Sequence, residues 1–274
     1  MTVRDLLVAG TDELSRAGVP SPRVDAEWLL AHALGVSRSE LYADGDEAPA
    51  DRERVFRELV ARRAAREPLA YVLGEWGFRR LTLTVDPRVL IPRPETELLV
   101  ERCLELVAGL AEPRVLDVGV GSGAIALAIK DEHEGARVVA TESSPDALAV
   151  AAVNVERTGL DVELVGGELF AGLDGPFDLV VSNPPYVAPE EIDDLAPEVA
   201  EHEPRGALVE SGQTGAIAEQ ALSRLAPGGA LALEVADGKA QLVAELLREL
   251  GYEDVTIGED LGGRERVVDG RAPR

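Results

Sequence analysis

The chain has 274 residues, of which 27 are basic and 51 are acidic, so its formal net charge is −24. Long nucleic acids are bound through Lys and Arg side chains that meet phosphates, and this charge argues against such partners. The single cysteine, Cys103, excludes a disulfide framework and a cysteine-based zinc site. The sequence has no apolar run long enough to span a membrane and no basic leader before an apolar segment. We therefore expect no membrane association and a cytoplasmic location.

Residues 1–70 are predicted to form a small helical domain. Apolar residues in the segment 3–14 recur at helical spacing. Ser21 followed by Pro22 is typical of a helix start, and Gly35 is typical of a helix end. These signals predict two helices before residue 40.

A third helix is predicted around residues 55–60 and should end at Pro68. It carries a group of arginines: Arg52, Arg54, Arg57, Arg62, Arg63 and Arg66. Two interpretations of this group remain open. The arginines form a solvated helix face, or they form a docking surface for a partner with acidic or phosphate groups. We expect the helical domain of residues 1–70 to dock the substrate.

Residues 71–90 are predicted to form a β-hairpin linker, because apolar residues from Leu81 to Val85 alternate with threonines. Residues 91–274 then alternate strands with segments of helical length, which indicates an α/β domain with a mostly parallel sheet. In such sheets, ligands bind beyond the carboxyl ends of the strands. The strand candidates are residues 114–118, 137–142, 161–165, 178–182, 230–235, 254–257 and 265–268.

A glycine-rich turn joins the first of these strands to a helix. Its residues are Asp117, Gly119, Val120, Gly121, Ser122 and Gly123. Glycines let a ligand approach the backbone closely. The spacing is Gly-x-Gly-x-Gly rather than the Gly-x-Gly-x-x-Gly typical of dinucleotide sites. Asp117 would repel a pyrophosphate but could hold an ammonium group. The turn therefore favours S-adenosyl-L-methionine as cofactor over a dinucleotide.

Two further strand ends add candidate cofactor contacts. Glu142 ends the second strand about 20 residues beyond the glycine turn, where an acid can accept hydrogen bonds from both ribose hydroxyls. Glu168 and Leu169 follow the third strand. There, Leu169 offers an apolar surface to an adenine ring, and Glu168 offers a hydrogen-bond acceptor.

The most specific motif is Asn183-Pro184-Pro185-Tyr186, which directly follows the fourth strand. The prolines restrict the backbone and hold Asn183 away from helical conformation. The Asn183 side-chain oxygen and the Pro184 carbonyl oxygen would then be two fixed acceptors, which match the two N–H donors of a planar –NH₂ group. Tyr186 could lie against the flat face of that group.

This tetrapeptide, with the glycine turn and Glu142, resembles the amino-methyltransferases that use S-adenosyl-L-methionine. Three further stretches, residues 68–74, 89–97 and 260–266, are similar to the release factor glutamine methyltransferase family. The resemblance covers nearly the whole chain. Departures from the family are Val120 in place of a threonine, Glu142 and Glu168 in place of aspartates, and Leu169 in place of an aromatic residue.

The resemblance implies a class I, Rossmann-like methyltransferase fold with a seven-stranded sheet, joined by a hairpin to the helical domain. It also implies methyl transfer to the side-chain nitrogen N5 of the glutamine in the Gly-Gly-Gln motif of class I peptide chain release factors, which would modulate translation termination. Residues 119–123 would face the methionine part of the cofactor and Glu142 its ribose. Residues 183–186 would hold the glutamine amide, with Asn183, Pro184 and Tyr186 as the catalytic set.

Three alternatives stay open at this stage. An adenine-N6 nucleic-acid methyltransferase would use the same tetrapeptide on a flipped base, but the charge of −24 and the lack of a basic recognition region argue against it. A non-catalytic nucleotide-sensing or assembly protein would not need an intact Asn183 and Pro184. A nicotinamide oxidoreductase conflicts with the position of Asp117.

Overall fold

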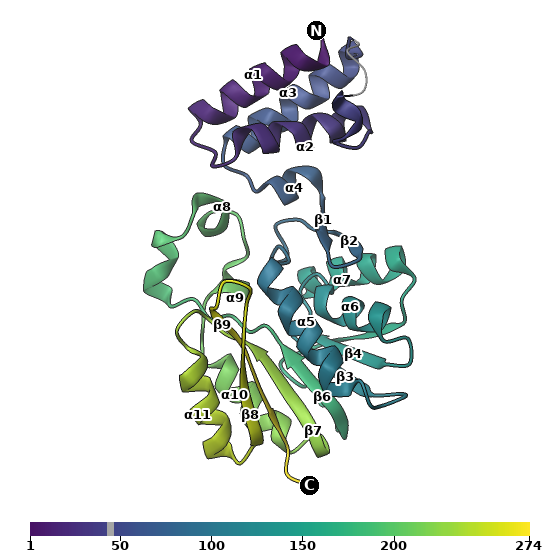
Figure 1. Cartoon of the computed structure of the whole chain (residues 1–274), viewed down its shortest axis with the longest axis vertical. Helices are drawn as coiled ribbons and strands as arrows, with labels where there is room; N and C mark the ends of the chain where they lie inside the picture. Colours follow the sequence, from purple (N-terminus) through teal and green to yellow (C-terminus); the bar gives the residue numbers. More distant parts are fainter. Residues whose placement is uncertain (43–46) are drawn as a thin grey trace. The chain divides into compact units, whose positions relative to one another are not determined.

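The computed structural model describes residues 1–42 and 47–274. They form two compact units. One contains Met1–Glu75 and Leu195–His202, and the other contains Trp76–Asp194 and Glu203–Arg274 (Figure 1). The first unit is helical, with α1 Val3–Arg16, α2 Pro22–Leu34, η1 Glu40–Tyr42, α3 Ala50–Ala64, α4 Leu69–Leu73 and α8 Pro197–Ala200.

The helical unit has its own core of buried aliphatic side chains around Phe56. Gly10 allows α1 to approach α3 closely, because a Cβ atom there would lie 2.6 Å from the Phe56 ring. Gly35 ends α2 in the left-handed conformation, as its position predicted. Pro68 does not end α3, since that helix stops at Ala64 and the proline instead precedes α4. The chain has left the helix before it reaches Pro68, and Arg66 in this segment has a left-handed backbone.

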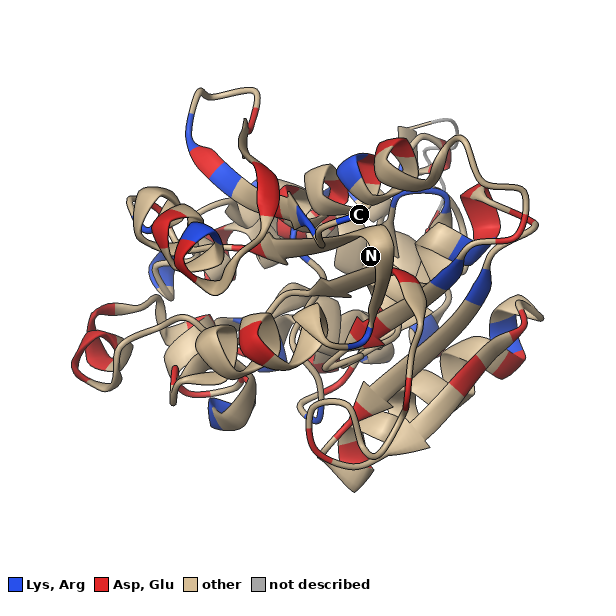
Figure 2. Ribbon diagram, turned by 90° about the horizontal axis from the view of Figure 1, so that it is seen from below, with Lys and Arg blue, Asp and Glu red and all other residues tan. Residues whose placement is uncertain are grey.

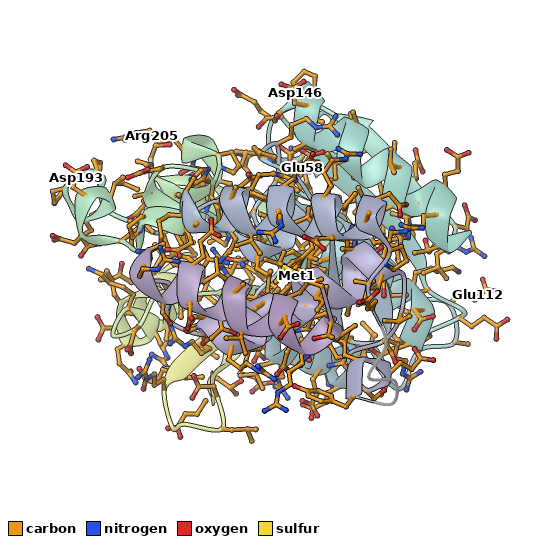
Figure 3. All side chains as sticks on the ribbon, turned by 90° about the horizontal axis from the view of Figure 1, so that it is seen from above. Met1, Glu58, Glu112, Asp146, Asp193 and Arg205 are labelled. Carbon is orange, nitrogen blue, oxygen red and sulfur yellow. The ribbon has the colours of Figure 1, made fainter. Side chains whose placement is uncertain are left out.

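The arginines on and after α3 bind groups of the same unit. Arg54 pairs with Glu58, which Figure 3 labels on this helix, Arg57 pairs with Glu53, and Arg62 pairs with Glu67. The buried Arg63 guanidinium contacts Asp25 and Glu198, both at 2.8 Å, and Arg66 also pairs with Glu198. Arg52 donates to the Ala33 carbonyl oxygen. These pairs leave little unbalanced positive charge, which favours the solvated-face interpretation of the two.

A two-stranded hairpin opens the second unit, with β1 Glu75–Phe78 and β2 Leu81–Thr84. It begins later than residue 71, because residues 69–73 form α4. The Asn154 side chain anchors it: Oδ1 accepts from the Thr84 backbone N–H at 2.7 Å, and Nδ2 donates to the Thr84 carbonyl at 2.9 Å. The same Nδ2 donates to the Ser122 carbonyl at 2.8 Å, which ties the hairpin to the glycine turn.

The second unit is built on a seven-stranded sheet of order β5-β4-β3-β6-β7-β9-β8. Strand β9 is antiparallel to β7 and β8, and the other pairs are parallel. The mostly parallel α/β fold is confirmed. The strands are β3 Arg114–Val118, β4 Arg137–Glu142, β5 Val162–Gly166, β6 Phe177–Ser182, β7 Leu225–Glu234, β8 Glu253–Glu259 and β9 Glu265–Arg271.

Helices cover the sheet through two separate apolar clusters. One cluster joins α5 Pro94–Val107, α6 Ala124–Glu132 and α7 Pro145–Thr158 to the sheet, and the other joins α10 Gln213–Leu222 and α11 Ala240–Leu250 to it (Figure 1). The short segments η2 Pro189–Asp194 and α9 Arg205–Leu208 follow β6. Because β3, β4, β6 and β7 are parallel neighbours, their carboxyl ends meet at one edge of the sheet. Acidic residues are distributed along the ribbons of both units rather than gathered in one segment (Figure 2).

Candidate active site

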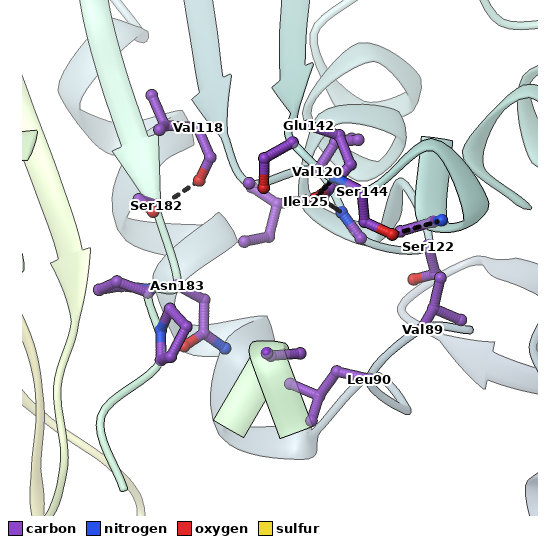
Figure 4. A pocket seen from close by; sticks show the side chains of 18 of the residues that line it. Val89, Leu90, Val118, Val120, Ser122, Ile125, Glu142, Ser144, Ser182 and Asn183 are labelled. Atoms are coloured by element: carbon purple, nitrogen blue, oxygen red, sulfur yellow. Dashed lines mark hydrogen bonds between the residues drawn. The ribbon is translucent and has the colours of Figure 1, made fainter. Parts of the chain in front are cut away.

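A cavity of about 370 Å³ opens at the carboxyl ends of β3, β4 and β6. This is the edge at which ligands of parallel sheets bind, and the volume lies within the range of small-molecule sites. Asn183 and Glu142 face the open space from opposite sides (Figure 4). The walls come from six segments of the chain: residues 88–96, 118–125, 141–147, 167–169, 182–185 and 204–217.

The glycine turn needs its glycines for backbone conformation. Gly119, Gly121 and Gly123 have φ values of +83°, +54° and +89°, which side chains with a Cβ rarely adopt. The backbone N–H groups of Gly119 and Val120 both donate to the Thr141 carbonyl at 2.9 Å. The turn is therefore fixed against the end of β4. Residues 119–122 line the cavity, whereas Gly123 does not.

Glu142 lines the cavity and is fixed by two backbone groups. One carboxylate oxygen accepts from the Gly121 N–H and the other from the Ser144 N–H, each at 2.9 Å. A carboxylate offers about four acceptor positions, so two remain for the hydroxyls of a ribose. The arrangement holds the carboxylate in place before any ligand binds.

Asp117 is buried beneath the glycine turn and does not line the cavity. Its Oδ2 accepts from the Ala126 N–H at 3.1 Å, while Oδ1 has no hydrogen-bond partner among the described residues. Burial raises the pKa of this carboxyl to about 7, against the hydrogen bond from Ala126, and the charge of Glu142 adds to the increase. Contact with an ammonium group of the cofactor stays a prediction.

Leu169 lines the cavity, whereas the neighbouring Glu168 is exposed and outside its wall. The Leu169 backbone is left-handed, with φ of +48°, and its carbonyl accepts from the Thr141 hydroxyl at 2.5 Å. This bond holds the loop after β5 against the end of β4. Contact of Glu168 with an adenine ring stays a prediction.

The tetrapeptide follows β6, whose end is held by the Ser182 hydroxyl donating to the Val118 carbonyl at 2.6 Å (Figure 4). Asn183, Pro184 and Pro185 line the cavity, and Tyr186 lies just beyond its wall. Burial and the nearby charge of Glu234 raise the pKa of Tyr186 to about 12, so its phenol stays neutral.

The Asn183 amide has partners that the sequence did not indicate. Its Nδ2 donates to the Thr96 hydroxyl of α5 at 3.3 Å. Glu234, the last residue of β7, lies close enough for Thr96 and Asn183 to lower the pKa of its carboxyl. Thr96 lies within the 89–97 stretch, but neither residue was a predicted site residue. A carboxylate that ends an otherwise apolar strand was the only signal for Glu234.

An ion pair fixes a second wall of the cavity. Arg93, which lines it, pairs with the buried Glu203 carboxylate, and that carboxylate also accepts from the Ile91 N–H at 3.4 Å. Burial raises the pKa of Glu203, against the charge of Arg93. The pair holds the 89–97 stretch to the segment that precedes α9.

Among the described residues, no group of three His, Cys, Asp or Glu side chains could hold a metal ion. Within the same residues, no helix has both the length and the apolar character needed to cross a bilayer.

Comparisons with known proteins identify the family of the chain. A family model described as "PrmC N-terminal domain" matches residues 5–74, and one described as "Methyltransferase small domain" matches residues 94–257. The release factor glutamine methyltransferase of Deinococcus radiodurans is 45% identical over 277 residues, which cover 99% of both chains. The chain belongs to the release factor glutamine methyltransferase family.

A second member of this family, from Geobacter sulfurreducens, is 44% identical over 278 residues, which cover 98% of this chain and 96% of the relative. The fold also resembles a 16S rRNA methyltransferase of T. thermophilus solved with AdoMet and guanosine, with a TM-score of 0.55 and 20% identity over 72% of this chain and 49% of that one. The protein is an S-adenosyl-L-methionine-dependent methyltransferase of the release factor glutamine methyltransferase family.

Proposed function

We propose that the protein methylates the side-chain nitrogen N5 of the glutamine in the Gly-Gly-Gln motif of class I peptide chain release factors, in the cytoplasm. The observation that carries this proposal is the position of Asn183 and Pro184 on the cavity wall, at the end of β6. The relatives named as release factor glutamine methyltransferases match the chain over nearly its full length, which supports the substrate class.

The cofactor fits the residues present. In our proposal, residues 119–122 face its methionine part, the two free acceptor positions of Glu142 bind its ribose, and Leu169 packs on its adenine. The fixed carboxylate of Glu142 and the cavity of about 370 Å³ support this assignment. When bound, S-adenosyl-L-methionine supplies a methyl group on a positively charged sulfur, which is electrophilic without help from a metal.

The difficult part of the reaction is the amide nitrogen, which is a weak nucleophile because its lone pair is delocalised into the carbonyl. In our proposal, Asn183 Oδ1 and the Pro184 carbonyl oxygen accept the two N–H groups and aim the nitrogen at the methyl group, while Tyr186 lies against the amide face. Such positioning can contribute roughly 7–11 kcal/mol. The two acceptors also stabilise the positive charge that develops on nitrogen. No general base is assigned, because the nitrogen becomes strongly acidic after methyl transfer and can lose its proton then.

The proposal is tested by incubating the protein with methyl-labelled S-adenosyl-L-methionine and three purified substrates. These are a class I release factor, the same factor with the motif glutamine replaced by glutamate, and adenine-containing DNA. We expect label in the first substrate alone, because glutamate has no side-chain nitrogen. Label in DNA would favour the adenine-N6 alternative, and equal label in both release factors would place the methyl group elsewhere on the protein.

A further inference from the structure

Glu234 is a buried carboxylate beside the proposed catalytic residues. It ends β7, and residues 230–233 before it are buried and apolar. Ser182 of β6 is in register with Leu233 of β7, so Glu234 lies next to Asn183 across the two strands. Its exposed fraction is 2%. A carboxylate is costly to bury without partners, so this position calls for an explanation.

No ion pair neutralises Glu234 among the described residues. Thr96 and Asn183 are the polar side chains close enough to lower the pKa of its carboxyl, and Oε2 is buried with no partner in the described part of the chain. The charged groups that face it are Glu95 of α5 and Arg266 of β9, but the Arg266 guanidinium is already paired with Asp260 at 3.2 Å. The carboxylate is therefore held as a hydrogen-bond acceptor rather than as half of a salt bridge.

An acceptor in this place determines which group donates in the hydrogen bonds of Thr96 and Asn183. An ionised carboxylate can only accept, so the Thr96 hydroxyl donates its proton to Glu234. The Thr96 oxygen is then free to accept from Asn183 Nδ2, which lies 3.3 Å away. With Nδ2 engaged on this side, Oδ1 is the atom left for the cavity.

We propose that Glu234 is a positioning residue, which acts on Asn183 directly and through Thr96 to fix the amide with its Oδ1 toward the substrate –NH₂ group. A reversed amide would present donors to donors and could not hold the substrate nitrogen. This inference rests on the proposed function, because it assumes that the substrate offers two N–H groups at Asn183. It adds two residues, Glu234 and Thr96, to those that the reaction requires.

The same arrangement makes the rate depend on pH. Burial, together with the charge of Glu95, raises the pKa of Glu234 to about 7, although Thr96, Arg266 and Asn183 oppose the increase. A protonated Glu234 can donate to Thr96, which removes the reason for the hydroxyl to accept from Asn183. We therefore expect kcat to fall as the pH is lowered through about 7. Tyr186 also faces Glu234, but its pKa of about 12 keeps it neutral throughout.

The test measures kcat, KM for a full-length release factor and the cofactor dissociation constant of the whole protein, at pH values from about two units below to about two units above pH 7. Glu234→Gln has nearly the same shape but carries a donor. We expect it to lower kcat by at least roughly tenfold, less than the loss of a direct partner. We also expect it to abolish the acidic fall in kcat and leave cofactor binding unchanged. Glu249→Gln, on the exposed face of α11, is the matched control.

Thr96 supplies the second arm of the experiment. Thr96→Val removes the hydroxyl and should reproduce part of the loss of Glu234→Gln, whereas Thr96→Ser keeps it and should restore most of the rate. The double variant of Glu234→Gln and Thr96→Val should be no slower than Glu234→Gln alone. A Glu234→Gln protein with normal kcat and an unchanged pH profile would overturn the inference, as would additive losses in the double variant. Failure of the wild-type protein to methylate any release factor would instead overturn the proposed function.

Discussion

At the scale of single residues, the site combines groups that the backbone holds in place before a ligand arrives. Glu142 is fixed by the N–H groups of Gly121 and Ser144, and Asn183 is fixed by Thr96. Preorganisation of this kind avoids the cost of reorienting polar groups during the reaction. The two residues face the cavity from opposite sides, and each should affect a different step.

Replacement of Asn183 by alanine should affect the chemical step. Loss of one preorganised polar partner costs on the order of 10²–10³ in rate. We expect Asn183→Ala to lower kcat by about that factor, while equilibrium titration shows S-adenosyl-L-methionine bound nearly as tightly as before. Turnover close to that of the wild type would mean that Asn183 does not hold the substrate nitrogen.

Replacement of Glu142 by alanine should affect cofactor binding instead. A hydrogen bond to a charged group contributes roughly 1.5–3 kcal/mol, so loss of this carboxylate should weaken binding by at least about tenfold. At saturating cofactor, kcat should change much less. Calorimetric titration measures the dissociation constant, and an unchanged value would leave Glu142 as a support for the glycine turn alone.

At the scale of helices and strands, the sequence predicts the elements better than their contacts. Strands β3 and β4 begin and end where their apolar runs predicted. Strand β7 starts at Leu225 rather than at residue 230. Its first part contains Pro227 and two glycines, which are typical of a turn, so the sequence predicted a later start. The register of this part against β6 is irregular. From the order of the motifs along the chain, Asn183 and Glu142 were expected at the ligand-binding edge of the sheet, and both line the cavity.

Other features of the site depend on packing between distant segments, which one sequence does not reveal. Thr96 and Glu234 meet Asn183 only because α5 and β7 both pack against the end of β6. The burial of Asp117 is likewise a result of the turn closing over it. A motif identifies the residue types of a site, but it does not show which of them a ligand can reach.

Replacement of Asn154 of α7 tests how much its hydrogen bonds stabilise the β1–β2 hairpin. Asn154→Ala would leave the Thr84 N–H and two carbonyl groups without their partner. Unsatisfied buried polar groups cost about 1–3 kcal/mol each, and we expect the free energy of unfolding to fall by roughly 2–4 kcal/mol. Urea unfolding measures this change, with Val153→Ala on the exposed side of the same helix as control. A loss no larger than that of the control would contradict the anchoring role.

At the scale of the whole molecule, we propose that the helical unit recognises the folded release factor while the cavity recognises only the glutamine. Since the arginines of α3 are paired internally, charge is a poor candidate for this recognition. Val24 and Trp28 of α2 are instead exposed apolar side chains, 43% and 41% accessible, at positions that share one helix face.

Replacement of both Val24 and Trp28 by serine should therefore separate protein from peptide substrates. Exposed aromatic anchors often contribute more than 1 kcal/mol to an interface, so kcat/KM for the full-length release factor should fall by about tenfold. For a short peptide that contains the motif, kcat/KM should not change. Val153→Ser, in the other unit, serves as the control. An unchanged ratio between the two substrates would show that this helix face does not dock the release factor.

In the proposed reaction, the acceptors at the end of β6 direct one methyl group to one side-chain nitrogen. Tandem mass spectrometry of a release factor, after incubation with the protein and S-adenosyl-L-methionine in the presence of competing DNA, measures this most directly. We predict a single methyl group on N5 of the motif glutamine, and no such product with the Asn183→Ala protein. A methyl group on another residue or on adenine, or full modification by the variant, would contradict the account.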